Sequence, residues 1–196
     1  MNTLWRNLTP PYGTILADPP WRYRKSAQEK STVHARTLVS DLYDTMSMQQ
    51  LAELPVAELA AKDAHLYMWV TVPRLFGERD DREGFGPFQI MQAWGFRYIT
   101  MLTWHKSGAP GMGSYFRIDT EHCLFGVRGR APIPPSKRLR NVIVAPRGRH
   151  SEKPARLYEI AEAVSPSPRL ELFARARRDG WDAWGNEAPS LSAGAR

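Results

Sequence analysis

The segment Thr14-Ile15-Leu16-Ala17-Asp18-Pro19-Pro20-Trp21 decides how the rest of this sequence is interpreted. Its first half, residues 14–17, is an apolar run that is too short for a helix and is stopped by two prolines, so it predicts a strand. The Asp-Pro-Pro-Trp tetrad, residues 18–21, then stands at the carboxyl end of this strand. Because proline lacks an N–H, the turn offers carbonyl oxygens that are free to point outward.

The tetrad can bind an amino group on an aromatic ring. The carboxylate of Asp18 and the neighbouring carbonyl oxygens form a cluster that only accepts hydrogen bonds, which suits an NH2 group. The indole of Trp21 offers a flat apolar face on which a base can stack. A structural interpretation fits these four residues as well, because Asp-Pro-Pro is a common turn and Trp21 can belong to the core.

Apolar patterns of the strand and helix types alternate along the rest of the chain. Strands are predicted at residues 14–17, 66–72, 97–104, 122–127, 141–145 and 169–174, and helices at residues 47–61, 85–94 and 152–164. Ser47 can cap the first helix, and Pro55 is placed to break it in two. The alternation predicts an α/β fold with a mostly parallel sheet and helices on both faces. We expect one domain over residues 1–188 and a flexible tail over residues 189–196.

Composition excludes several classes of protein. The chain has 196 residues and one cysteine, Cys123, so an intrachain disulfide framework and a cysteine-based metal cluster are both ruled out. The longest apolar run, residues 66–73, is too short to span a membrane, and the first eleven residues lack the apolar core of a signal peptide. The histidines and acidic residues show no metal-ligand spacing. We therefore expect a cytoplasmic protein without a metal ion.

The basic residues are concentrated in one part of the chain. The net charge is +7, and residues 128–178 alone contain 13 lysines and arginines against 4 acidic residues. Such a field attracts polyanions, although a basic surface also serves solubility. Three stretches, residues 22–41, 74–86 and 106–119, lack apolar periodicity and follow predicted strand ends. They are candidate substrate loops or lids, or else ordinary surface connections.

Further motifs follow the tetrad in a fixed order. They read Tyr43-Asp44-Thr45-Met46-Ser47, Leu66-Tyr67-Met68-Trp69-Val70-Thr71, Trp94-Gly95-Phe96, Trp104-His105-Lys106, Glu121-His122-Cys123-Leu124-Phe125-Gly126-Val127, Lys153-Pro154, Glu171-Leu172-Phe173-Ala174-Arg175 and Trp184-Gly185-Asn186. In this order they resemble the amino-methyltransferases with a DPPW signature that modify N6 of adenine. More specifically, the chain resembles the family of the catalytic subunit of the messenger-RNA adenosine methyltransferase, with its bacterial and phage relatives. The similarity runs from about residue 12 to residue 186.

This resemblance implies a Rossmann-like methyltransferase that uses S-adenosylmethionine. The order of motifs is permuted, with the catalytic tetrad ahead of the cofactor segments, which accounts for the lack of a Gly-x-Gly-x-x-Gly turn after the first strand. The resemblance assigns Lys153 to the methionine carboxylate of the cofactor and Arg175 and Asn186 to its ribose region. Phe173 would shape the same pocket, although it can also be a simple core residue.

The resemblance also implies roles at the target base, and the sequence departs from the family in two places. Asp18 would lie near both the methionine part of the cofactor and the target amine. The tetrad, residues 18–21, would be catalytic, and Trp21, Tyr43 and Lys106 would bind the substrate. Glu187 would stand in the cofactor site where a glutamine often follows Gly-Asn in the family. Residues 177–178 are two arginines where the eukaryotic subunit has His-Asn, so the contacts to the adenosyl group are open.

The expected reaction is methylation of N6 of adenine in DNA. The Asp18 carboxylate and the Pro19 carbonyl would accept the two hydrogens of the amine and make its nitrogen a better nucleophile. Two alternatives stay open, namely the same reaction on RNA adenosine and a non-catalytic subunit that binds nucleic acid. DNA is preferred because the sequence shows no zinc finger or accessory RNA-binding segment. A homodimer or a partner subunit is also compatible with the sequence.

Overall fold

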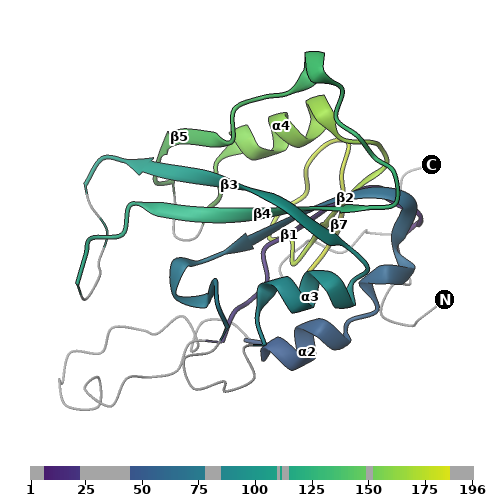
Figure 1. Ribbon diagram of the computed structural model, residues 1–196, viewed down its shortest axis with the longest axis horizontal. Helices are drawn as coiled ribbons and strands as arrows, with labels where there is room; N and C mark the ends of the chain where they lie inside the picture. Colours follow the sequence, from purple (N-terminus) through teal and green to yellow (C-terminus); the bar gives the residue numbers. More distant parts are fainter. Residues whose placement is uncertain are drawn as a thin grey trace.

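The computed structural model describes residues 7–22, 45–77, 85–109, 111, 115–148 and 152–185 (Figure 1). The strands are β1 (Tyr12–Ala17), β2 (Ala60–Val70), β3 (Arg97–Ser107), β4 (Thr120–Arg128), β5 (Val142–Pro146), β6 (Arg169–Leu172) and β7 (Asp182–Trp184). The α-helices are α2 (Met48–Glu53), α3 (Pro87–Ala93) and α4 (Ala155–Val164), and short 3-10 turns cover Val56–Glu58, Val72–Arg74 and Pro135–Lys137. Within the described residues, no helix is long and apolar enough to cross a membrane.

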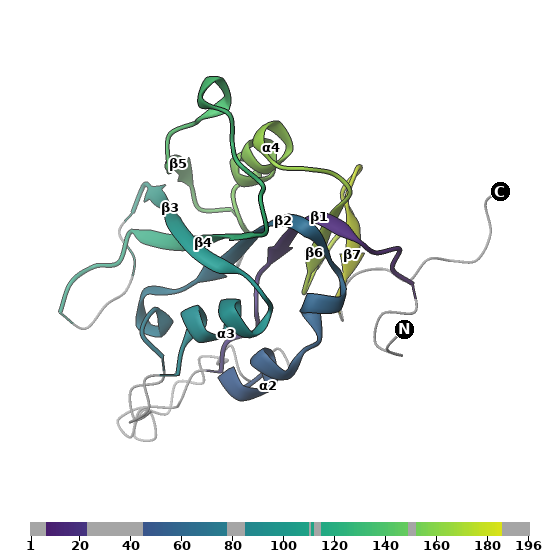
Figure 2. The same ribbon diagram turned by 45° about the vertical axis from the view of Figure 1, so that its right-hand side comes forward.

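The strands form one mixed sheet in the order β5-β3-β4-β2-β1-β6-β7. Neighbouring strands pair in parallel except at β4, which is antiparallel to both β2 and β3. Helix α4 covers one face, and α2 and α3 cover the other (Figure 2). The predictions of an α/β fold, a mostly parallel sheet and helices on both faces are therefore confirmed.

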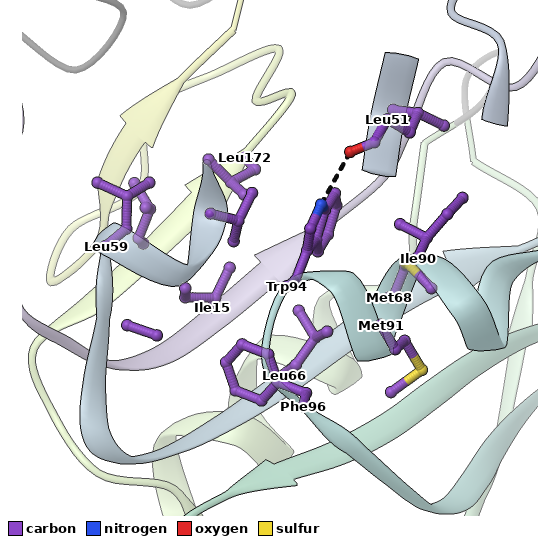
Figure 3. Packing of buried hydrophobic residues seen from close by; sticks show 14 of the residues in the cluster. Ile15, Leu51, Leu59, Leu66, Met68, Ile90, Met91, Trp94, Phe96 and Leu172 are labelled. Atoms are coloured by element: carbon purple, nitrogen blue, oxygen red, sulfur yellow. Dashed lines mark hydrogen bonds between the residues drawn. The ribbon is translucent and has the colours of Figure 1, made fainter. Parts of the chain in front are cut away.

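The central strand β1 is buried on both faces, so its side chains supply two separate cores. Ile15 packs in the cluster beneath α2 and α3, whereas Leu16 packs in the cluster beneath α4. Consecutive residues face opposite sides because side chains alternate along a strand. In the first cluster, the indole Nε1 of Trp94 donates to the carbonyl of Leu51 at 2.8 Å and ties α3 to α2 (Figure 3).

The first predicted helix is shorter than the apolar spacing indicated. Ser47 caps it as expected, since its side chain accepts from the N–H of Gln50, but α2 ends at Glu53. Leu54 is extended because a residue that precedes proline is disfavoured in the helical region. One 3-10 turn follows Pro55, and β2 begins at Ala60, so the prediction of a helix up to residue 61 is wrong.

Two further differences concern the carboxyl-terminal third. Helix α4 begins at Ala155 with Pro154 as its N-cap, so Lys153 precedes the helix and does not lie in its first turn. Strand β7 was not predicted from the sequence, because its three residues are too few to show periodicity. Strand β7 pairs in parallel with β6 and places Trp184 beside Leu172.

Candidate active site

The Asp-Pro-Pro-Trp turn lies at the carboxyl edge of the central strand β1. Asp18 follows β1 directly, between the ends of the neighbouring strands β2 and β6. Lys106 lies near the end of β3, and Glu121 lies at the second position of β4. Because β4 is antiparallel to its neighbours, its start reaches the same edge where β1 and β3 end.

Four side chains at this edge form a row in which the sign of the charge alternates, which we call the charge chain: Asp18, Lys153, Glu121 and Lys106. The ammonium Nζ of Lys153 lies 3.0 Å from Oδ2 of Asp18 and 3.1 Å from Oε1 of Glu121. The other oxygen of Glu121, Oε2, lies 2.8 Å from Nζ of Lys106. The side chains of Lys153 and Glu121 are only 9% and 10% exposed, so the two inner charges are held largely away from water. The four charges sum to zero, which is the arrangement that buried charges require.

Burial and charge oppose each other at the two inner residues. Burial acts to raise the pKa of the Glu121 carboxyl, but Lys153 and Lys106 outweigh it, and the pKa is lowered. Burial acts to lower the pKa of Lys153, yet Asp18 and Glu121 raise it above its ordinary value. Both residues are therefore charged at neutral pH. We infer that these charged side chains are held rigidly, because moving any one of them away would leave a buried charge unpaired.

Two tryptophans lie beneath the ammonium groups. Nζ of Lys153 lies 5.5 Å from the ring centroid of Trp69, and Nζ of Lys106 lies 4.8 Å from that of Trp104. The two indoles contact each other edge to face, with centroids 6.2 Å apart. Each aromatic face attracts the cation above it. The Nε1 of Trp69 is buried and has no hydrogen-bond partner within the part of the chain that the structure describes.

The prolyl carbonyls of the tetrad are already engaged, which corrects the expectation that they point freely outward. The carbonyl of Pro19 accepts from the N–H of Trp21 at 2.8 Å, and that of Pro20 accepts from the N–H of Met46 at 2.9 Å. The missing N–H groups of the prolines did not predict this, because the donors belong to Trp21 and Met46, which follow the prolines. Each carbonyl oxygen keeps a second lone pair.

The structure also corrects the expectation that Trp21 presents a free face to a base. Its indole is 4% exposed and belongs to the core beneath α2 and α3. Its Nε1 donates to the carbonyl of Trp69 at 3.1 Å and so joins the turn to the end of β2. The structural interpretation of this tryptophan is the one observed.

The remaining residues of the predicted cofactor site lie beyond β6. Phe173 directly follows this strand with a φ of 63°, which is uncommon for an aromatic residue, and its ring packs edge to face on Trp184 with centroids 5.6 Å apart. Arg175 is exposed on the segment that follows. Three predicted site residues, Tyr43, Asn186 and Glu187, lie outside the described residues, as does the tail, residues 189–196.

Two carboxylates near Asp18 were missed by the sequence analysis. Glu121 was noted only as part of a strand motif, and it links both lysines. Glu171 on β6 accepts from the hydroxyl of Tyr158 at 2.8 Å, and burial and the nearby Asp18 raise its pKa. An acidic residue inside an apolar strand was a usable signal, because a buried carboxylate requires a partner.

The fold and this edge define the class of protein: a Rossmann-like α/β domain with a carboxylate-rich site at the end of its first strand. A model of the MT-A70 family matches residues 12–187, and the chain belongs to this family. It is 32% identical to the Type II methyltransferase M.MunI of a Mycoplasma species, over 91% of this chain and 78% of that protein. This bears out the resemblance that the motifs indicated.

Eukaryotic relatives match the same region. The N(6)-adenine-specific methyltransferase METTL4 of Mus musculus is 28% identical over 90% of this chain and 37% of its own length. The N6-methyladenosine RNA methyltransferase MTA1 of Cryphonectria parasitica is 29% identical over 91% of this chain and 52% of its own length. The chain therefore spans only about a third to a half of these two proteins.

Proposed function

We propose that this protein methylates N6 of adenine in DNA with S-adenosylmethionine as the methyl donor. The observation that carries the proposal is the Asp18 carboxylate, which a buried lysine holds at the edge of the central strand beside a proline turn. DNA is the first candidate because M.MunI, which the chain covers over 78% of its length, is named a Type II methyltransferase without reference to RNA. The same reaction on RNA is the second candidate, because MTA1 is named as an RNA methyltransferase.

The residues at the edge fit the methionine end of this cofactor. That end carries one carboxylate and one ammonium group. Lys153 has three N–H donors and uses two of them on Asp18 and Glu121, which leaves one for a carboxylate. The buried Nε1 of Trp69 is an unused donor beside the same ammonium group. Asp18 and Glu121 can accept from the ammonium group of the cofactor.

Asp18 acts on the target amine. S-adenosylmethionine, when bound, supplies an electrophilic methyl group on its sulfonium. The Asp18 carboxylate accepts a hydrogen bond from the exocyclic amine and increases electron density on the nitrogen. The second lone pair of the Pro19 carbonyl can accept the other hydrogen. Lys153 fixes the carboxylate in position, and this fixed geometry contributes to rate through proximity.

The first test is nucleoside mass spectrometry of DNA and RNA incubated with the protein and S-adenosylmethionine. We expect N6-methyldeoxyadenosine with the wild type and none with Asp18→Ala. Asp119→Asn is a matched control, because it removes an exposed carboxylate that pairs with Arg147 outside the charge chain. Product in RNA alone would favour the second candidate. Retained methylation in Asp18→Ala would refute the assigned role, and cofactor binding without product on either polymer would refute the proposed reaction.

A further inference from the structure

A concave site lies at the opposite end of the sheet from Asp18. It is a cavity of about 610 Å³ between β3, β4, α4 and the segment 129–141 that connects β4 to β5. Its lining from β3 runs from Arg97 to Leu102, whereas Lys106 of the charge chain lies near the other end of that strand. Figure 2 shows the segment leaving β4, passing α4 and returning to β5. The volume is in the range of pockets that hold small molecules or single nucleotides.

A β-bulge shapes the floor of this cavity. Tyr98 and Thr100 pair with the consecutive residues Gly126 and Phe125 of β4, so Ile99 is an extra residue in the ladder. Without the bulge, alternation would place Ile99 and Thr100 on opposite faces. With it, both residues line the cavity. Both are also exposed, so the floor offers accessible surface.

The segment that forms the roof is anchored at both ends. His65 contacts the carbonyl of Ala131 through Nε2 at 2.6 Å and Oγ of Ser165 through Nδ1 at 2.8 Å. The N–H of Arg130 donates to the Asp63 carboxylate at 2.6 Å. At the far end, the side chain of Asn141 donates to the carbonyl of Met101 at 3.1 Å. These bonds hold the roof in place, so the cavity is formed before any ligand arrives.

The rim of the cavity is strongly basic. Four lining residues are arginines, namely Arg97, Arg130, Arg138 and Arg140, and none of the lining residues is acidic. In the described part of the chain, none of these four guanidinium groups forms an ion pair. The sequence from 128 to 148 contains six basic residues and no acidic residue. Phe125 and the aliphatic floor provide apolar contact below this rim.

We propose that this arginine-rimmed cavity takes up an unpaired base of the substrate strand, several nucleotides from the target adenine. An apolar floor suits a base, and uncompensated guanidinium groups suit the flanking phosphates. The inference rests on the proposed function, because it requires a nucleic-acid substrate. Leu102 and Arg97 lie four and nine residues from Lys106, or about 13 and 30 Å along the strand. This span corresponds to about 4 to 9 stacked nucleotides at 3.4 Å each.

The test is the affinity of fluorescent single-stranded oligonucleotides, DNA and RNA of one sequence, measured by anisotropy. Thr100→Trp fills the floor from an exposed strand position where an aromatic residue is well tolerated. Arg138→Ala removes one charge from the rim. Lys137→Ala is the matched control, because it removes the same charge from the same segment at an exposed position that does not line the cavity.

We expect Arg138→Ala and Thr100→Trp to raise Kd by about 10-fold, in line with the loss of one hydrogen bond to a charged group or one stacking contact. Arg138→Ala should reduce the slope of log Kd against log salt by about one, whereas Lys137→Ala and Thr100→Trp should leave the slope unchanged. Affinity of the wild type should increase as oligonucleotides lengthen from 4 to about 12 nucleotides, and Thr100→Trp should reduce this gain. Thermal unfolding checks that each variant is folded.

Several outcomes would overturn the inference. Equal affinity of wild type, Arg138→Ala and Thr100→Trp for long oligonucleotides would do so, as would a wild type that binds none of them. If the wild type instead self-associates in sedimentation and Thr100→Trp abolishes this, the cavity is an interface between two copies and the proposal is wrong. Methylation is measured separately. If Arg138→Ala and Thr100→Trp weaken oligonucleotide binding but the wild type methylates no adenine, the proposed function is refuted and the cavity is a nucleic-acid site without a target adenine.

Discussion

The two ends of β3 and β4 carry opposite arrangements of charge. At one end, Lys106, Glu121, Lys153 and Asp18 alternate in sign and neutralise one another at contact distance. At the other end, the rim of the cavity has four arginines and no lining carboxylate. Compensated charge fixes atoms in place, as a reaction requires, whereas uncompensated charge attracts a polyanion. The two proposals thus assign the chemistry to one end of the sheet and the attraction of substrate to the other.

The largest effect should come from Asp18→Asn. This change keeps the shape of the side chain but removes the negative charge that pairs with Lys153 and that we propose faces the target amine. We expect methyl transfer to fall on the order of 10³-fold, in line with loss of a group that stabilises developing charge. The measurement is kcat with a saturating oligonucleotide. Activity within 10-fold of the wild type would show that the charge at this end of the sheet has no role in chemistry.

A smaller effect on the cofactor should follow Lys153→Ala. The change removes the ammonium donor and leaves the carboxylates of Asp18 and Glu121 without this shared partner. We expect affinity for S-adenosylmethionine to fall about 10- to 100-fold, since hydrogen bonds to charged groups contribute about 1.5–3 kcal/mol. Calorimetric titration measures it, with the exposed Lys137→Ala as control. Unchanged cofactor affinity would refute the role of Lys153.

Glu121→Ala tests whether the alternating charges at the Asp18 edge stabilise the fold. It leaves two lysines without their common carboxylate, and breaking such a buried pair costs about 3 kcal/mol. We expect the free energy of unfolding in urea to fall by about this amount. The double variant Glu121→Ala, Lys106→Met should recover part of the loss, because one unpaired cation is removed. If Glu121→Ala is as stable as the wild type, the alternating charges do not hold this edge together.

The two ends should also respond to pH in different ranges. Glu121 has a lowered pKa, so its stabilisation is present above its ordinary pKa of 4.5 and is lost as pH falls through its lower folded value. His65, which anchors the roof of the cavity, has a pKa lowered from 6.5, chiefly by burial. Protonation of His65 therefore lowers the free energy of unfolding once pH falls below 6.5, because the unfolded chain takes up the proton at a higher pH than the folded chain does.

Hydrogen exchange from pH 7 to pH 5 tests this difference. Amides at the start of the roof, near Ala131, should lose protection before amides near Glu121 do, after correction for the intrinsic pH dependence of exchange. The variant His65→Asn should remove the loss near Ala131 over this range. A uniform change at both ends of the sheet would contradict the separate titrations.

The sequence predicted much of the fold because its signals are local. The apolar run before the tetrad and the cap at Ser47 each depend on residues within one strand or one turn. The short strand β7 escaped this reasoning, since three residues show no period. The long first helix was overpredicted, because residues that pack against the sheet after Pro55 are apolar whether or not they are helical.

The sequence by itself determined the alternation of strands and helices, the position of the Asp-Pro-Pro-Trp turn at a strand end and the concentration of basic residues. Only the tertiary structure decided that Trp21 is a core residue, that Glu121 joins two lysines and that the bulge at Ile99 shapes a basic cavity. Lys153 and Asp18 are 135 residues apart in sequence. Their contact depends on the order and direction of the strands, which no local pattern of residues specifies.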